Sequence, residues 1–381
     1  MEIKIGLKAT MNRTKNCGAT HDVLEVNAMS LYSSFSKIKN SYYGIPIDSD
    51  ELFEKAENCR LFINEHFKEG GKQQALNLPF SDEYICSGKH FHTVSLYLLG
   101  LHLQKLFQQK IASNLKRKIP ALGQWYDDCY EYKYSWFLSC LYHDTASCVE
   151  AISDPNNTSC CNNCIDRYRF PPANYCRFKR KTVKNYCRYR KDNKAQDHGI
   201  FGGCMLYDRL CRNFKRKTSG HNWEENPVCM KDGLAWRREH LDHFAYVADA
   251  IICHNMWTAR GDDEKAVERY KSYGLDELII YSDEDKLSIG QYPLQFMLCL
   301  LDTIEPIKRF SSLSAREVLE NISIDPLENN GIRISWKECI KREADFRTWM
   351  NGISTLEDWM YVDVSNCHQA EEWCYVEISF R

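Results

Sequence analysis

Histidines and aspartates with the chemistry of metal ligands stand at the ends of apolar, helix-like segments in this chain. Neutral imidazole and carboxylate are groups that bind divalent transition metals in proteins. Packed helices hold the side chains at their ends rigidly, while the adjoining loops stay open to a substrate. We therefore predict that these side chains converge on a metal centre. The residues concerned are His92, His143, Asp144, His198, His254 and Asp302.

The adjacent pair His143–Asp144 bears on the number of metal ions. A carboxylate can bridge two metals while the neighbouring imidazole binds one of them. Two ions about 3.5–4 Å apart suit phosphoryl chemistry, because one activates water and both neutralise charge on the phosphate. A single histidine at the end of an apolar helix is more often a core or capping residue. Five such sites in a fixed order favour the metal interpretation.

That order, H…HD…H…H…D, resembles the HD-domain superfamily of metal-dependent phosphohydrolases over about residues 85–310. Short sequences at the ligand positions carry the resemblance: HTVS at 92–95, LYHD at 141–144, HGxxGG at 198–203, AIxxH at 250–254 and LLDTIEPIKRF at 300–310. The HGxxGG and LLDTIEPIKRF sequences are similar to the branch that hydrolyses dinucleoside polyphosphates symmetrically.

The resemblance implies one or two divalent ions, drawn from Fe, Mn, Mg, Co and Ni. His92, His143, Asp144 and Asp302 would hold the first ion. The HD pair of this superfamily is commonly followed by a short Gly-Lys turn, whereas Thr145 follows it here. One usual phosphate-binding lysine is therefore missing.

Asp144, His198 and His254 would hold or approach a second ion, and the resemblance makes Asp144 and His198 the expected catalytic residues. Members with two metals often have a His-His pair at the fourth motif. This chain has His254–Asn255 at that position. Asparagine is a poor replacement ligand for iron, so a weak or absent second metal is the alternative.

A basic segment joins the HD pair to His198. Between Asp166 and Asp197 eleven lysines and arginines stand against three acids, a local net charge of +8, although the whole chain carries −2. Such a segment attracts polyanions, and its interleaved aromatic residues suit base stacking. The alternative is a solvated loop whose aromatic side chains hold it to the core. The predicted substrate contacts are Arg177, Lys179, Arg180, Lys308 and Arg309.

Cysteines in the same segment have partial zinc-site spacing. Cys161 and Cys164 form a C-x2-C pair, and Cys176 and Cys187 could complete a tetrahedral structural zinc site. The second C-x2-C of a full zinc motif is absent. Plain cysteine richness is the alternative, because the chain has 19 cysteines and many stand in apolar runs.

The 381 residues are 44% hydrophobic and 27% charged, which is ordinary globular usage and excludes a fibrous or fully disordered chain. We predict a mostly α-helical HD core with a small α+β C-terminal part. Helical periodicity appears near 49–67, 92–107, 130–142, 199–214, 237–253 and 292–310, and strand-like alternation appears after 320. The expected parts are a helical extension at 1–84, the HD domain at 85–310 with an insert at 151–197, and the C-terminal extension at 311–381.

No apolar run is long enough to span a bilayer, and the first residues are too polar for a signal peptide. We therefore expect a cytoplasmic protein with reduced thiols and no membrane partner. Motifs for Walker-type ATP hydrolysis, dinucleotide binding and serine hydrolysis are missing.

The predicted function is hydrolysis of a phosphate bond in a nucleotide or dinucleotide by a metal-dependent phosphohydrolase or phosphodiesterase. One alternative is an HD-type nuclease that binds single-stranded nucleic acid along the basic segment. A second alternative is an inactive HD scaffold that binds a nucleotide signal or a protein partner. The sequence leaves the oligomeric state open.

Overall fold

The structure is a computed structural model of the chain. It describes residues 92, 96, 99–100, 102–120, 128–144, 176–193, 198–231, 234–306, 308–310, 312–313, 315–370 and 372–381. The expected N-terminal extension, with its helix at 49–67, lies outside the described residues. Among the described helices, none has the length and apolarity needed to cross a membrane.

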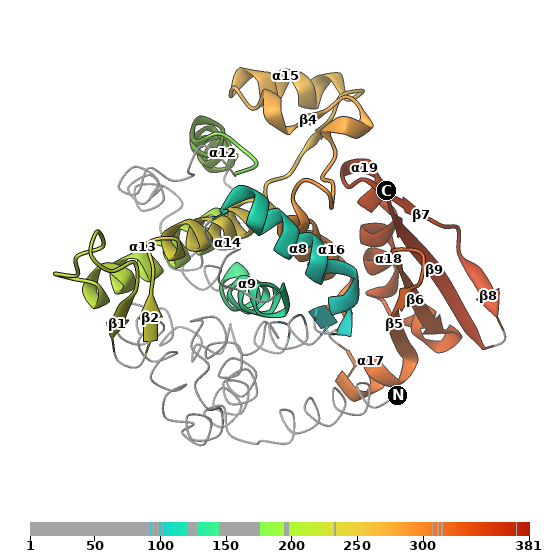
Figure 1. Ribbon diagram of the computed structural model, residues 1–381. Coiled ribbons are helices and arrows are strands. Elements are labelled where there is room, and N and C mark those ends of the chain that lie inside the picture. Colours follow the sequence, from blue (N-terminus) through green and yellow to red (C-terminus); the bar gives the residue numbers. More distant parts are fainter. Residues whose placement is uncertain are drawn as a thin grey trace, which may run out of the picture.

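Helices form the centre of the molecule (Figure 1). Residues 92, 96, 99, 100 and 102 are helical, and α8 follows at Gln104–Lys118. The other central helices are α9 (Asp128–His143), α13 (His198–Lys217), α14 (His240–His254) and α16 (Pro293–Ile304). Both α14 and α16 are apolar on most sides, so they are buried and the other helices pack around them.

Two glycines let α13 approach α14 and the end of α9 closely. A Cβ on Gly203 would lie 2.5 Å from Ile252 Cγ1 and 2.6 Å from the Ala248 carbonyl oxygen. A Cβ on Gly202 would lie 2.7 Å from the carbonyl oxygen of Tyr142 at the end of α9. The HGxxGG sequence thus joins α13 tightly to the two helices that end in His143 and His254.

The C-terminal part is a small antiparallel sheet with helices beside it. Strands β5 (Ile322–Leu327), β6 (Gly331–Lys337), β9 (Trp373–Phe380) and β7 (Val362–Val364) lie in that order, and β8 (His368–Ala370) also pairs with β9. Alternate side chains of β6 and β9 are buried, as expected for a sheet with one covered face. The Phe380 ring lies 5.7 Å from Phe107 of α8 and 5.3 Å from Phe296 of α16, so the sheet shares the helical core.

Smaller elements surround this body. The hairpin β1 (Cys229–Lys231) and β2 (Leu234–Trp236) lies at the far side from the sheet, and α18 (Phe346–Ser354) and α19 (Leu356–Trp359) lie beside the sheet (Figure 1). Strands β3 (Ala259–Arg260) and β4 (Ile279–Ile280) pair in parallel around α15 (Glu264–Ser272). A short helix, α17 (Ala315–Asn321), precedes the sheet, and 3-10 turns occur at Asp276–Leu278, Asp283–Asp285 and Glu338–Arg342.

The mostly helical class and the strands after 320 are confirmed. One detail of the prediction is wrong. The helix predicted to 310 ends at Ile304, because Pro306 cannot continue it. Within the predicted insert, Arg180–Asp192 forms the helix α12, for which the sequence showed no periodicity.

Candidate metal centre

The six predicted ligand residues come from five separate segments and meet at helix ends. His143 is the last residue of α9 and Asp144 follows it, His198 is the first residue of α13, and His254 is the last residue of α14. His92 stands on the segment before α8 and Asp302 on the last turn of α16. The helix-end positions expected from the sequence are thus the ones that the fold brings together.

The side chains of His92, His143, Asp144 and Asp302 form the first group. His92 Nε2 lies 3.1 Å from His143 Nε2, 2.8 Å from Asp302 Oδ1 and 3.9 Å from Asp144 Oδ2. His143 Nε2 lies 3.7 Å from Asp144 Oδ2 and 3.8 Å from Asp302 Oδ1. Ligands about 2.1 Å from a common ion are about 3.0 Å apart at right angles and about 4.2 Å apart when opposite. All five measured separations suit a shared metal ion.

Hydrogen bonds fix which nitrogen each imidazole directs to the group. His92 Nδ1 lies 3.0 Å from Glu305 Oε2, and His143 Nδ1 lies 2.8 Å from the carbonyl oxygen of Cys140. Each Nδ1 therefore donates a proton away from the group, and Nε2 of both rings faces it. A carboxylate or carbonyl behind the imidazole is the usual support of a metal-binding histidine. These histidines fit a metal ion in their donor atoms as well as in their separations.

Asp144 connects this first group to His198 and His254. Its Oδ2 atom faces His92 and His143, whereas Oδ1 lies 3.3 Å from His198 Nε2. The His254 ring centroid is 5.7 Å from that of His143 and 5.5 Å from that of His198. The two oxygens of one carboxylate thus face two sets of imidazoles, which is the arrangement a bridging ligand requires.

Lys308 reaches the first group from the turn after α16. Its ammonium nitrogen lies 3.0 Å from Asp302 Oδ1, 3.3 Å from His92 Nε2 and 3.6 Å from Asp144 Oδ2. Burial opposes the charge of Lys308, but Asp302 and Asp144 outweigh it and raise the pKa of the ammonium. Burial and Lys308 lower the pKa of His92, and hydrogen bonds to Asp302 and Glu305 raise it by more. In the metal-free protein the ammonium of Lys308 therefore lies against both carboxylates and offsets their charge.

Both carboxylates stay ionised despite burial. Burial would raise the pKa of Asp144, but Lys308 and the surrounding histidines hold it well below its usual value. Burial would likewise raise the pKa of Asp302, but the charge of Lys308 and the hydrogen bond from His92 hold it well below normal. Burial lowers the pKa of His143 to about 3. At neutral pH these three side chains therefore have the protonation states that bind metal.

The other predicted substrate cations lie at separate places. Arg309 donates from Nη2 to the carbonyl oxygen of Asp302 at 3.1 Å, so it braces the helix end. Lys179 forms an exposed ion pair with Glu277 at 2.8 Å, and Arg180 is the first residue of α12. The guanidinium of Arg177 lies 4.8 Å from the Phe178 ring centroid. Of the predicted cations only Lys308 has its charged group in the first group of ligands.

The aromatic side chains of the insert that the structure describes are mostly core residues. Phe178 and Tyr186 are buried, and Tyr189 is partly buried against that core. The alternative in which aromatic residues hold the basic segment to the core therefore applies to this part of the insert. Stacking of a base on Phe178 or Tyr186 is excluded by their burial.

Half of the predicted zinc site can be placed. Cys161 and Cys164 lie outside the described residues. Cys187 is buried on α12, and Cys176 lies close to Asp249 and Cys253, with burial raising its pKa well above the usual value. A thiol that resists ionisation is a poor zinc ligand in this metal-free state. The zinc hypothesis stays a prediction.

Two contacts of the centre were not foreseen from the sequence. Glu305, fully buried, is the partner of His92 and also accepts a hydrogen bond from the backbone nitrogen of Lys308 at 3.1 Å. Asn255 places its amide nitrogen 3.5 Å from His198 Nδ1. Glu305 belongs to one of the short sequences that carry the resemblance and Asn255 directly follows another, but those sequences gave no indication of the hydrogen bonds that Glu305 and Asn255 make.

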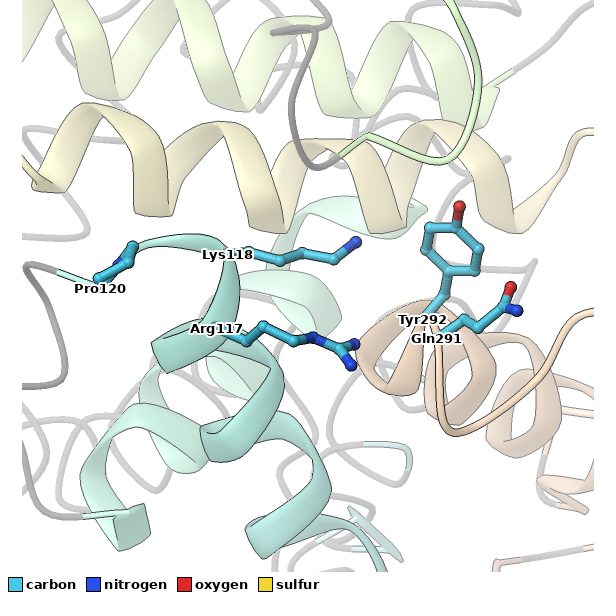
Figure 2. A pocket seen from close by; sticks show the side chains of 5 residues that line it. All are labelled: Arg117, Lys118, Pro120, Gln291 and Tyr292. Carbon is cyan, nitrogen blue, oxygen red and sulfur yellow. The ribbon is translucent and has the colours of Figure 1, made fainter.

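A separate pocket of about 590 Å³ lies between the end of α8 and the start of α16 (Figure 2). Arg117 and Lys118 extend across it toward Gln291 and Tyr292, and the Lys118 ammonium is 4.6 Å from the Tyr292 ring centroid. The Arg177 guanidinium is 5.8 Å from the same ring. None of the six predicted ligands lines this pocket.

Comparison with family models, curated proteins and solved structures finds no match for this chain. Among the described residues, His92, His143 and Asp144 form the group of metal-ligand type, with one donor atom from each within 4.8 Å of the others. A buried histidine and aspartate cluster of this kind is compatible with a divalent metal.

Proposed function

We propose that this protein is an HD-type metal-dependent phosphohydrolase that cleaves a phosphate bond of a nucleotide or dinucleotide. The observation that carries the proposal is the set of five separations, from 2.8 to 3.9 Å, that relate the donor atoms of His92, His143, Asp144 and Asp302. These residues come from three segments that lie far apart in the sequence, in the order that the resemblance predicts. A merely structural role would not require three such segments to direct ligand atoms at one point.

Under this proposal His92, His143, Asp144 and Asp302 would hold one ion. Asp144 would share a second with His198 and His254. Bound metal would supply Lewis acidity toward phosphate and would favour ionisation of water.

Four side chains around the ligands would orient them, hold a proton or offset charge on the phosphate. Glu305 orients His92, and Arg309 steadies the backbone at Asp302. His198, whose side chain is 25% exposed, can hold a proton at Nε2 beside Asp144 Oδ1. Lys308 can leave its carboxylate partners and offset charge on a phosphate, because its side chain is 23% exposed and attached to a turn.

Metal analysis and hydrolysis assays on the same preparations test the proposal. The purified protein should carry a transition metal, or acquire activity with Mn²⁺, and release phosphate or a nucleotide from a panel of nucleoside and dinucleoside polyphosphates. His143→Ala and Asp144→Ala should each lose the metal and the activity together. His102→Asn is the control, because His102 bonds to the Ile324 carbonyl outside the ligand groups.

Two results would contradict the proposal. One is the absence of metal binding in a folded parent protein, which would favour the inactive scaffold. The other is full activity in both alanine variants. Cleavage of single-stranded DNA or RNA without action on nucleotides would select the nuclease instead, and its affinity for strands should fall steeply with salt.

A further inference from the structure

Trp257 is an exposed aromatic residue held in a fixed position. Its relative exposure is 60%, which is unusual for a tryptophan in a folded protein. Its backbone nitrogen donates to the Tyr186 hydroxyl at 2.9 Å, and its carbonyl accepts from the Tyr270 hydroxyl at 3.1 Å. Two buried tyrosines therefore fix the backbone while the indole stays in solvent.

A short chain of contacts connects this indole to the metal centre. Trp257 Nε1 donates to Asn255 Oδ1 at 3.2 Å, and Asn255 Nδ2 lies 3.5 Å from His198 Nδ1. His198 in turn lies 3.3 Å from Asp144. One amide side chain thus separates the indole from a predicted catalytic histidine.

Arg190 of α12 covers part of the indole. Its guanidinium carbon lies 4.6 Å from the Trp257 ring centroid, a cation–π distance. The 60% exposure of Trp257 is that which remains with Arg190 in place, so this contact does not bury the residue. α12 itself is held beside α15, since Tyr273 donates to Asp192 at 3.0 Å and the Tyr189 and Tyr270 rings are 5.2 Å apart.

We propose that Trp257, backed by Arg190, is the stacking platform for the base of the nucleotide substrate. This inference rests on the proposed function for the position of the phosphate, and it adds the recognition of a planar base. A rigid indole beside the metal centre can stack on any base, whereas hydrogen bonds to particular base edges are not needed. Asn255 acts as a positioning residue that sets the indole angle relative to His198.

Binding of a paired set of probes tests the platform. Isothermal titration in Mn²⁺ would compare α,β-methylene-ADP with methylenediphosphonate, which has the bridged phosphorus groups but no base. The parent should bind the nucleotide analogue more tightly. Trp257→Ala should lose about tenfold or more of that affinity, because base–aromatic stacking contributes about 1–3 kcal/mol per base. Methylenediphosphonate affinity and metal content should not change.

Further variants separate stacking from misfolding. Trp257→Phe should recover part of the nucleotide affinity, and Arg190→Gln should reduce it less than Trp257→Ala does. Tyr281→Ala is the matched control, because Tyr281 is an equally exposed aromatic residue at 59% and makes no contact with the centre among the described residues. Melting temperatures of all variants establish that each is folded.

The outcomes distinguish this inference from the proposed function. Equal affinity of the parent for the two probes, or no binding of either, contradicts the platform. So does a Trp257→Ala protein that keeps the full preference for the nucleotide analogue. A preference that depends on Trp257 in a protein without metal binding or hydrolysis would support a nucleotide platform while contradicting the phosphohydrolase.

Discussion

The ammonium nitrogen of Lys308 lies 3.0 Å from Oδ1 of Asp302, the same oxygen that lies 2.8 Å from His92 Nε2. Lys308 is therefore bonded to atoms that a metal ion would need. A divalent ion entering this group has to displace the ammonium, because two cations cannot share these donors at such distances. Lys308 thus acts as a tethered counter-ion of the metal-free protein.

Replacement of Lys308 by methionine tests whether the lysine ammonium and a divalent ion compete for the same donor atoms. Without the ammonium, Asp144 and Asp302 lose a buried partner, and we expect the metal-free protein to lose about 2 kcal/mol or more of stability. Affinity for Mn²⁺ should rise about tenfold or more, since the ion no longer competes with a lysine. Chelator competition and urea unfolding with and without metal measure both effects.

Lys286→Met is the control for this change. Lys286 pairs with Asp283 at 2.6 Å and has a similarly exposed side chain, 20% against 23% for Lys308, but it lies outside the ligand group. The Lys286→Met variant should bind Mn²⁺ with the same affinity as the parent protein. Weaker Mn²⁺ binding by Lys308→Met would show that the lysine supports the metal and does not compete with it.

Glu305→Gln should weaken metal binding while preserving the fold. The substitution keeps the shape and hydrogen-bonding atoms behind His92 but removes the charge that makes its imidazole a stronger ligand. Loss of such a supporting carboxylate typically costs 10–100-fold in affinity, and we expect about tenfold for this isosteric change. The measurement is the Mn²⁺ dissociation constant, with Glu277→Gln as a control because Glu277 binds Lys179 and Thr182 away from the centre. Parent-like metal affinity in Glu305→Gln would refute the supporting role.

Gly203→Ala tests the close packing of α13 on α14. The added Cβ would lie 2.5 Å from Ile252 Cγ1 and 2.6 Å from a backbone oxygen, so the helices must separate. We expect a loss of about 1–3 kcal/mol in unfolding free energy, with weaker metal binding because His198 and His254 move apart. The matched helical change is Gly352→Ala in α18, where the nearest atom would be 3.6 Å away. That variant should gain about 0.5–1 kcal/mol from helix propensity, and equal effects of the two changes would contradict the packing argument.

Helical periodicity predicted most elements of the described core, because buried helices such as α14 show their apolar positions plainly. α12 was missed for a physical reason. Lysines and arginines occupy six of its 13 positions, so its narrow buried face of Thr182, Val183, Tyr186 and Cys187 is hard to see among the charges. The same helix places Arg190 against Trp257, a contact between segments that no local pattern reports.

The sequence predicted the ligand residues of the candidate centre but not the residues that hydrogen-bond to those ligands. His92 and Asp302 each carry the chemistry of a ligand in the side chain itself. The part played by Glu305 and Lys308 depends instead on the turn after Ile304, where the helix ends and the chain folds back. Turn geometry of this kind follows from packing and not from residue periodicity. The exposure of Trp257 could not be predicted from the sequence either, because whether an aromatic residue is exposed depends on the fold.

Acid should destabilise the metal-free protein well before Asp144 and Asp302 are protonated. Two buried histidines of α14 lie outside the ligand groups: His243, which shares a 2.7 Å hydrogen bond with Ser135, and His240 beside Arg237. Burial lowers the pKa of His240 to about 4 and, with His240, that of His243 to about 3. The unfolded chain takes up these protons near pH 6.5, and the native protein does not. Their contribution to stability is therefore complete above pH 6.5 and declines as the pH falls toward 3–4.

The expected result is a free energy of unfolding that falls between pH 6.5 and pH 5 in the presence of chelator. Each such histidine contributes a slope of about 1.4 kcal/mol per pH unit. Asp249 opposes the trend below pH 6, because burial raises its pKa to about 6 and the native state then takes up a proton. His243→Gln should remove the equivalent of one proton from the slope, as measured by urea unfolding at several pH values. A slope identical to that of the parent would mean that His243 takes up its proton in the folded protein as readily as in the unfolded chain.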